Sequence, residues 1–359
     1  MRKAPIVYVG LSGGVDSAVS AALLQKAGYE VVGVFIRIAL PGYPCPIATD
    51  RQDAMRVAAH LRIQFKEIDL SEAYQKRVFD YTLSAFAAGR TPNPDTLCNR
   101  EIKFGLFFEW ARAQGANFVA TGHYARTQVL HGEAHLYAGV DTAKDQSYFL
   151  YMIPEGHLGH VLFPVGGYTK PEVRSLAQSF NLPNATRKDS QGLCFLGDIS
   201  IQDMLKRELV LQKGRVLSTD GTVIGEHEGA SRYTIGQRHG FTVAGHSSET
   251  QAQYVIAKNV ADNTITVSPN QTPHGSTKTK LIVSELNWIG EVTNGTYLAR
   301  FRYRQTLIPA TLTLTDDGAL VELVQPHYAP EGQSVVLYTQ DATGLRCLGG
   351  GVIQKVQIL

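Results

Sequence analysis

The chain has 359 residues, a formal net charge of +2 and 44% hydrophobic residues. This length exceeds one typical domain, so we expect two or three. No apolar run reaches the length of a membrane span, and the small net charge leaves any nucleic-acid binding to local patches. The first predicted strand begins almost at once, which leaves no room for a leader, so we expect a cytoplasmic protein.

Residues 10–17 form a Gly- and Ser-rich turn between a short apolar run and an apolar-faced helical stretch. A strand, a tight turn and a helix in this order direct backbone N–H groups and the helix dipole at one point, which suits a phosphate. The turn is neither a Walker loop nor a G-x-G-x-x-G motif. Residues 12–17 (SGGVDS) resemble the pyrophosphate loop of the N-type ATP pyrophosphatases, a resemblance that implies adenylation of a substrate without naming that substrate.

The first half of the chain alternates strands and helices. We expect further strands at 30–36, 64–70 and 117–122, and helices near 50–61, 71–88, 100–114 and 169–180. This alternation predicts an α/β domain, Rossmann-like, with a parallel sheet and helices on both faces. The ligand then lies beyond the carboxyl ends of the strands, where residues 10–17, the end of the second strand and Gly122 converge.

Two cysteines follow loops that present them. Two prolines exclude a helix through residues 89–99, and a helix is predicted from Arg100. Cys98 therefore lies near a helix N-terminus, where the dipole lowers a thiol pKa. Asp95 lies three residues earlier. Cys194 follows a polar loop and has the features of an accessible thiol beside two cations, Arg187 and Lys188. None of the four cysteines forms a C-x-x-C, which disfavours zinc or an iron–sulfur cluster, and we expect Cys45 and Cys347 to be structural.

The second half is rich in strands and turns. Residues 213–225 predict a hairpin that turns at Asp220 and Gly221, and residues 253–257 pair with 264–267. We expect a catalytic domain over 1–204, a small mixed or β central domain over 205–273, and a β-barrel over 274–359 that begins with a linker at 274–278. Alternation over residues 300–304 predicts three arginines on one strand face, which suits a phosphate backbone.

Nine motifs together are similar to one family, the bacterial tRNA 2-thiouridylases of the MnmA type. They occur in the family's order and cover nearly the whole chain: 12–17, 91–95, 98–99, 120–124, 144–148, 189–195, 233–238, 302–305 and 347–351. The resemblance implies ATP-dependent 2-thiolation of the wobble uridine in tRNAs for Lys, Glu and Gln, with Mg²⁺ and a sulfur donor protein, in a monomer. The donor is either a cysteine desulfurase or a sulfur-relay protein.

The resemblance also implies site residues. The nucleotide would contact Gly10, Leu11, Ser12, Gly13, Gly14, Val15, Asp16, Ser17, Ile36 and Gly122, with Asp16 near the metal. The target base would contact Asn93, Pro94 and Asp95, with Asp95 a candidate for proton transfer. The tRNA would contact His123, Lys144, Asp145, Gln146, Arg302, Tyr303 and Gln333. Cys194 would carry sulfur as a persulfide, and Cys98 would be its partner nucleophile.

Two routes remain open at this point. In one, the terminal persulfide sulfur attacks C2 of the adenylated uridine directly. In the other, Cys98 first releases hydrosulfide, which attacks C2. Both end in a Cys98–Cys194 disulfide that a reductant must reset. Rival hypotheses are a small-molecule ligase, which would need no cysteine pair, and a tRNA-binding module without catalysis. A cluster-dependent thiolation enzyme is a third, which the missing C-x-x-C disfavours.

Overall fold

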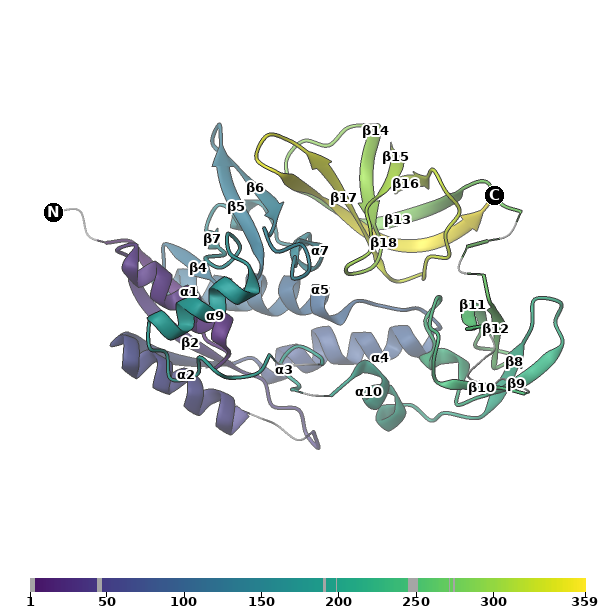
Figure 1. Cartoon of the computed structure of the whole chain (residues 1–359), viewed down its shortest axis with the longest axis horizontal. Helices are drawn as coiled ribbons and strands as arrows, with labels where there is room; N and C mark the ends of the chain where they lie inside the picture. The colour runs from purple at the N-terminus through teal and green to yellow at the C-terminus, as the bar shows by residue number, and fades with distance from the viewer. Residues whose placement is uncertain are drawn as a thin grey trace.

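The computed structural model describes residues 4–43, 47–189, 192–197, 199–244, 251–270, 272–273 and 275–359. Figure 1 shows three bodies: a parallel sheet with its helices at one end, a small sheet at the other, and a β-barrel above them. None of the described helices has the length and apolarity needed to cross a bilayer.

The first body is a five-stranded parallel sheet in the order β3-β2-β1-β4-β7. Its strands are β1 (Ile6–Gly10), β2 (Glu30–Arg37), β3 (Gln64–Asp69), β4 (Phe118–Ala120) and β7 (Val161–Leu162). One face packs on α1 (Val15–Lys26), α2 (Ile47–Leu61) and α9 (Lys170–Ser179). The expected helix-covered parallel sheet is therefore confirmed.

The opposite face packs on a run of shorter helices. They are α3 (Ser71–Tyr74), η1 (Gln75–Phe79), α4 (Asp80–Ala87), α5 (Pro94–Cys98), η2 (Asn99–Leu106), α6 (Phe107–Ala113), α7 (Ser147–Leu150) and α8 (Glu155–Leu158). Both η1 and η2 are π-helical. The predicted start at Arg100 was wrong: the helix begins at Pro94, because proline fits the first helical position, where no N–H is needed.

The central sheet has the order β10-β9-β8-β12-β11. Its strands are β8 (Gly214–Leu217), β9 (Val223–His227), β10 (Phe241–Val243), β11 (Tyr254–Asn259) and β12 (Thr264–Ser268). Helix α10 (Ile201–Glu208) precedes the sheet in the chain, and the short 3-10 helix η3 (Ala230–Arg232) lies between β9 and β10. Both predicted hairpins are present as antiparallel pairs, β8 with β9 and β11 with β12.

The third body is a closed six-stranded barrel. Its strands are β13 (Thr279–Trp288), β14 (Gly295–Arg300), β15 (Ile308–Thr315), β16 (Gly318–Leu323), β17 (Ser334–Gln340) and β18 (Leu345–Ile358), and the pairing of β13 with β18 closes it. A hairpin of the first body, β5 (Ala125–Leu130) and β6 (Glu133–Ala138), extends this sheet through β18. One hydrophobic core then spans both bodies and contains Cys347, whose burial raises its pKa to about 12.

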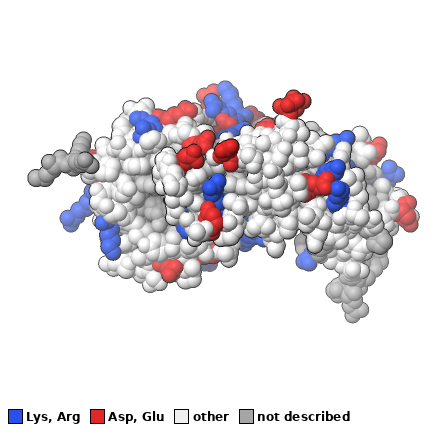
Figure 2. Space-filling view, turned by 90° about the horizontal axis from the view of Figure 1, so that it is seen from above, with Lys and Arg blue, Asp and Glu red and all other residues white. Residues whose placement is uncertain are grey.

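The predicted arginine face was wrong. Strand β14 ends at Arg300, and residues 301–304 form bends and a turn, so the three arginines share no strand face. Arg300 points inward to a buried ion pair with Asp145. On the face of the molecule seen in Figure 2, the described lysines and arginines lie scattered among acidic and uncharged residues. Cys45 lies outside the described residues, and so does His274, the first residue of the predicted linker.

Candidate active site

A cavity of about 550 Å³ opens at the carboxyl edge of the parallel sheet. The segments that line it are far apart in the sequence and include the turn after β1, the end of β2, the residues after β4, and the loop around Cys194. Residues of α2, α5 and η2 and of the stretch 144–149 line it as well. The barrel adds Tyr303 and Arg304. This volume suits a nucleotide-sized ligand. Nearly all the residues expected at the nucleotide line it: Gly10, Leu11, Ser12, Gly14, Val15, Asp16, Ser17, Ile36 and Gly122.

The turn after β1 is held closed by its own polar groups. The hydroxyl of Ser17 donates to the Gly14 carbonyl at 3.0 Å and accepts from the Ser12 N–H at 3.3 Å. Gly13 has φ +79°, and its carbonyl accepts from the Asn184 amide at 2.7 Å. A Cβ at Gly122 would lie 2.7 Å from the Ser17 nitrogen, so only glycine lets this backbone approach the turn. The turn is thus pre-formed for an anion.

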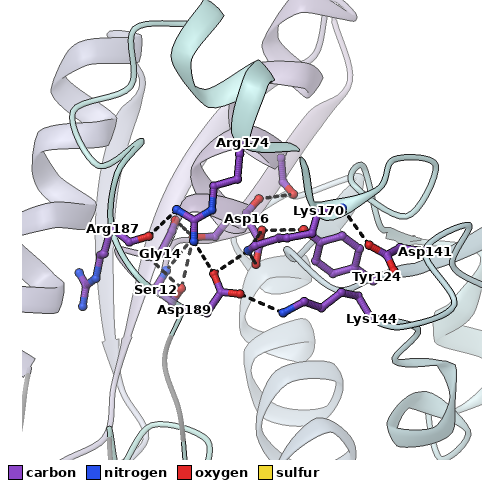
Figure 3. Close-up of polar contacts among 12 residues, drawn as sticks. Ser12, Gly14, Asp16, Tyr124, Asp141, Lys144, Lys170, Arg174, Arg187 and Asp189 are labelled. Atoms are coloured by element: carbon purple, nitrogen blue, oxygen red, sulfur yellow. Dashed lines mark hydrogen bonds and ion pairs between the residues drawn. The ribbon is translucent and has the colours of Figure 1, made fainter. Parts of the chain in front are cut away.

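An ion-pair network surrounds Asp16 (Figure 3). Lys170, at the start of α9, donates to both carboxylate oxygens of Asp16 at 2.7 and 2.9 Å, and the Tyr124 hydroxyl donates at 2.8 Å. The same lysine lies 2.8 Å from Asp189, which also binds Lys144 and Arg174. Burial opposes ionisation of Asp189, but hydrogen bonds from Lys170 and Lys144 outweigh it and lower its pKa to about 2.

Three cations, Lys144, Lys170 and Arg174, gather beside the turn among the carboxylates of Asp16, Asp141 and Asp189. Such a corner suits the phosphates of a nucleotide. Sequence reasoning missed Lys170 and Arg174, because a capping Thr-Lys-Pro-Glu motif indicates only where α9 starts.

The two predicted cysteines meet at the cavity, which Cys194 lines and Cys98 does not. Cys98 is fully buried at the end of α5, and Cys194 is partly exposed in its loop. The two side chains are hydrogen-bonded to each other. That bond lowers the pKa of Cys194 to about 7 despite burial, and Lys103 lowers it further. Cys194 is therefore the thiol that ionises near neutral pH.

The expected thiolate at Cys98 was wrong. Burial raises the pKa of Cys98 well above its usual value, and the neighbouring Cys194 raises it further. The helix dipole is a minor effect for a thiol that has no access to water. Arg187, one of the two cations expected beside Cys194, forms ion pairs with Asp50 and Asp53 instead. The cation in contact with Cys194 is Lys103 of η2.

Asp95 and Asn93 lie beside the cysteine pair. Burial raises the pKa of Asp95, against the effect of Lys103, and Asp95 lines the cavity. The Asn93 side chain caps α5 by accepting from the Thr96 N–H at 3.2 Å. It also contacts Gln333 of the barrel at 3.5 Å. Pro94 occupies the first helical position of α5 and is buried. The expected base-contacting residues thus stand together, where the barrel meets the first body.

The residues expected at the tRNA differ in their accessibility. His123 and Asp145 are buried, and the Gln146 amide oxygen accepts from the Tyr124 N–H at 2.9 Å. Arg302 donates to the carbonyls of Ile235 and Tyr328, which links the barrel to the central sheet. Apart from His123 and Asp145, these residues are partly exposed, and four of the seven line the cavity: His123, Lys144, Gln146 and Tyr303. Contact with tRNA stays a prediction for all seven.

The cavity residues fit ATP, and Asp16 fits a magnesium ion that ATP brings. No cluster of three or more His, Cys, Asp or Glu side chains suited to a metal occurs among the described residues. Mg²⁺ is commonly bound through one or two carboxylates together with substrate phosphates, so a lone Asp16 is a sufficient protein contribution.

Three family models match consecutive parts of the chain. They are the tRNA methyl transferase HUP domain over residues 5–198, the tRNA methyl transferase PRC-barrel domain over 202–269, and the aminomethyltransferase beta-barrel domain over 278–353. Curated relatives match over almost the full length. A tRNA-specific 2-thiouridylase MnmA of Neisseria meningitidis is 42% identical over 97% of this chain and 95% of its own. One from Geobacillus kaustophilus is 41% identical over 99% and 97%.

Solved structures that match are more distant. A 4-thiouridine synthetase in complex with RNA and ATP is 17% identical, covering 55% of this chain and 46% of its own, with a TM-score of 0.35. An NMN synthetase from Francisella tularensis is 18% identical, covering 52% and 66%, with the same TM-score.

Proposed function

The chain belongs to the family of tRNA-specific 2-thiouridylases, tRNA sulfurtransferases of the ATP pyrophosphatase type, and we propose that it thiolates C2 of the wobble uridine in tRNAs for Lys, Glu and Gln. One observation carries the proposal. Cys194 lines the cavity that the phosphate-binding turn also lines, and the fully buried Cys98 is hydrogen-bonded to it. A nucleotide loop suffices for a ligase, whereas the paired thiols are needed only where sulfur is transferred.

Adenylation is the first step of the proposed reaction. The C2 oxygen of uridine attacks the α-phosphorus of ATP, a P–O bond forms, and pyrophosphate leaves with the electron pair of the α–β bridge. The N–H groups of the turn and the cations around Asp16 would stabilise the departing charge. We propose that Asp16 holds Mg²⁺, which would supply further charge neutralisation at the phosphates.

Sulfur transfer follows at the cysteine wall. In one route the terminal sulfur of a Cys194 persulfide attacks C2, and AMP leaves with the C2 oxygen. Cys98 then gives up its proton, for which Asp95 is the candidate acceptor, and attacks the Sγ of Cys194. The S–S bond breaks, its electron pair leaves on the sulfur bound to C2, and a Cys98–Cys194 disulfide forms. In the other route Cys98 attacks first, and the hydrosulfide released attacks C2. In both, a two-electron reductant resets the disulfide.

The hydrogen bond between the two thiols supports both routes, since each route requires Cys98 and Cys194 to react with each other. Asp95, whose pKa is raised by burial, is placed to exchange a proton with the base or with Cys98. The target base would enter between the cavity and residues Asn93 and Gln333, which requires it to leave its stack.

Several further features belong to this proposal. We place the tRNA over Lys144, Tyr303 and Gln333, and we assign His123, Asp145, Gln146 and Arg302 to supporting that surface. A cysteine desulfurase or a relay protein would load Cys194. We further propose that the chain acts as a cytoplasmic monomer and that its domains divide near residues 204 and 273.

A tRNA-dependent assay tests the function. Unmodified tRNA, ATP, Mg²⁺, a cysteine desulfurase and cysteine are incubated with the enzyme, and the digested tRNA is analysed for 2-thiouridine by mass spectrometry alongside pyrophosphate release. We expect both products with the wild type, and pyrophosphate release without 2-thiouridine for Cys194→Ser. Pyrophosphate release that depends on a small-molecule acceptor instead of tRNA would assign the chain to the ligases.

A further inference from the structure

Lys103 is a cation that the reaction described above does not use. It lies within the π-helix η2 and lines the cavity. Its Nζ is 3.3 Å from Nε2 of His123 and 5.7 Å from the centre of the Phe195 ring, and it is hydrogen-bonded to the Cys194 side chain. π-Helical turns occur frequently at functional sites, where they change which side chains share a face.

The histidine beside Lys103 carries no charge. An ammonium group only donates, so Nε2 of His123 accepts from it, and the ring proton lies on Nδ1, 2.6 Å from the Thr121 hydroxyl oxygen. Burial lowers the pKa of His123 well below its usual value, and Lys103 lowers it further. His123 therefore orients the ammonium without neutralising it.

The charge of Lys103 needs a partner elsewhere. Among the residues that the structure describes, no carboxylate forms an ion pair with it, and Asp95 acts only from a longer distance. The Lys103 side chain is partly buried in the cavity wall, where an ammonium group without a counter-charge is destabilising. The group in contact that can become an anion is Cys194, and its presence, with that of Cys98, keeps the pKa of Lys103 high despite burial.

We propose that Lys103 is a catalytic residue of sulfur transfer, the counterion that holds the sulfur anion on Cys194 against the cavity wall. The inference rests on the sulfur transfer proposed above. The lysine keeps its proton throughout. When the terminal sulfur attacks, its electron pair forms the S–C2 bond and the C2–O pair leaves with AMP. When Cys98 attacks first, the S–S electron pair leaves on hydrosulfide, which Lys103 retains beside C2.

Other groups also face Cys194. Cys98 and Asp95 come from α5, and the Tyr74 hydroxyl of α3 donates to the Cys194 carbonyl at 2.9 Å. The hydrogen bond from Cys98 is the largest influence that lowers the Cys194 pKa, whereas Asp95 opposes it. Removing Lys103 therefore leaves one stabilising contact in place, and the sulfur should lose only part of its acidity.

The test measures Cys194 directly. Iodoacetamide labelling of wild type, Lys103→Met and Lys103→Arg is followed across a pH series without ATP or tRNA, and peptide mass spectrometry assigns the label to Cys194. We expect a wild-type midpoint near 7. An opposite charge in contact shifts a pKa by roughly 1–3 units, so Lys103→Met should raise the midpoint by about one unit or more, and Lys103→Arg by much less. An unchanged midpoint in Lys103→Met would overturn the proposal.

A second measurement separates this role from a structural one. Lys103→Gln keeps a hydrogen-bond donor for His123 but removes the charge, and it replaces Lys103→Met if that variant does not fold. The midpoint of Cys194 labelling should rise in Lys103→Gln as in Lys103→Met. In a single turnover with persulfide-loaded enzyme, both neutral variants should lose at least about tenfold in thiolation while tRNA-dependent pyrophosphate release continues. Equal losses of both products would show that Lys103 serves the fold or the nucleotide instead. The labelling result stands even if the substrate is not tRNA.

Discussion

The buried ion pair between Asp145 and Arg300 gives the most quantitative prediction. Asp145 belongs to the first body and Arg300 to the barrel, and their side chains are 3% and 10% exposed. The Asp145 carboxylate accepts from the guanidinium at 3.2 Å, from the Gly139 and Ser147 N–H groups at 3.2 and 3.0 Å, and from the Ser147 hydroxyl at 3.1 Å. The resemblance of residues 144–148 to the family implies tRNA contact here, whereas this geometry indicates a structural role.

Asp145→Ala should leave a buried guanidinium and two backbone donors without a partner. Breaking a buried pair from one side costs about 3–5 kcal/mol. Urea unfolding followed by fluorescence should show a loss of that size. Adding Arg300→Met removes the stranded charge and should recover more than about 1 kcal/mol. Asp317→Ala, in the exposed turn between β15 and β16, is the control and should change stability by less than about 0.5 kcal/mol.

Two readouts decide between the roles. The reasoning is refuted if Asp145→Ala unfolds at the wild-type urea concentration and binds tRNA more weakly. It is supported if stability falls and if Asp145→Ala and Arg300→Met lower tRNA affinity only where the barrel is no longer docked, as judged by limited proteolysis.

Three shorter predictions follow from the cavity. Gly122→Ala should abolish ATP binding in calorimetry, since its Cβ would lie 2.7 Å from backbone of the turn, whereas Gly167→Ala, with no atom within 4 Å, should bind normally. Lys170→Met should weaken ATP binding by about 10- to 100-fold, because a charged hydrogen-bond donor is worth about 1.5–3 kcal/mol, and Lys170→Arg should retain most of it. Loading of Cys194 with sulfur by a cysteine desulfurase should rise with pH through about 7 and then level off, because the Cys194 thiolate is lost as pH falls below its pKa; a loading rate that falls as pH rises from 6 to about 8 would contradict this.

The sequence was informative where structure is local. A Gly-rich turn between an apolar strand and a helix predicts an anion site wherever it occurs, and strand–helix alternation predicts a parallel sheet. The two central hairpins were likewise found from their turn residues, such as Asp220 and Gly221. These features depend on neighbours within a few residues, so a single sequence contains them.

The sequence was not informative where structure depends on distant partners. Hairpin β5–β6 pairs with β18, whose residue Cys347 lies opposite Leu136, and no local pattern indicates such a partner. The direction of the Cys98 pKa shift depends on burial beneath Cys194, which sequence position near a helix start does not give. Sequence reasoning gave Lys103 no role, because neither the π-helical turn that contains it nor its contact with Cys194 has a signal in the residue pattern.

The central claim is that Cys194 carries the sulfur that enters tRNA. The most direct test follows radiolabelled sulfur from a desulfurase through wild type, Cys98→Ser and Cys194→Ser, in the presence of ATP, Mg²⁺ and unmodified tRNA. The account predicts label in tRNA for the wild type alone, and reductant-sensitive label on the protein for wild type and Cys98→Ser only. Label in tRNA with Cys194→Ser, or none in tRNA from a wild type that forms AMP with a small-molecule acceptor, would contradict it.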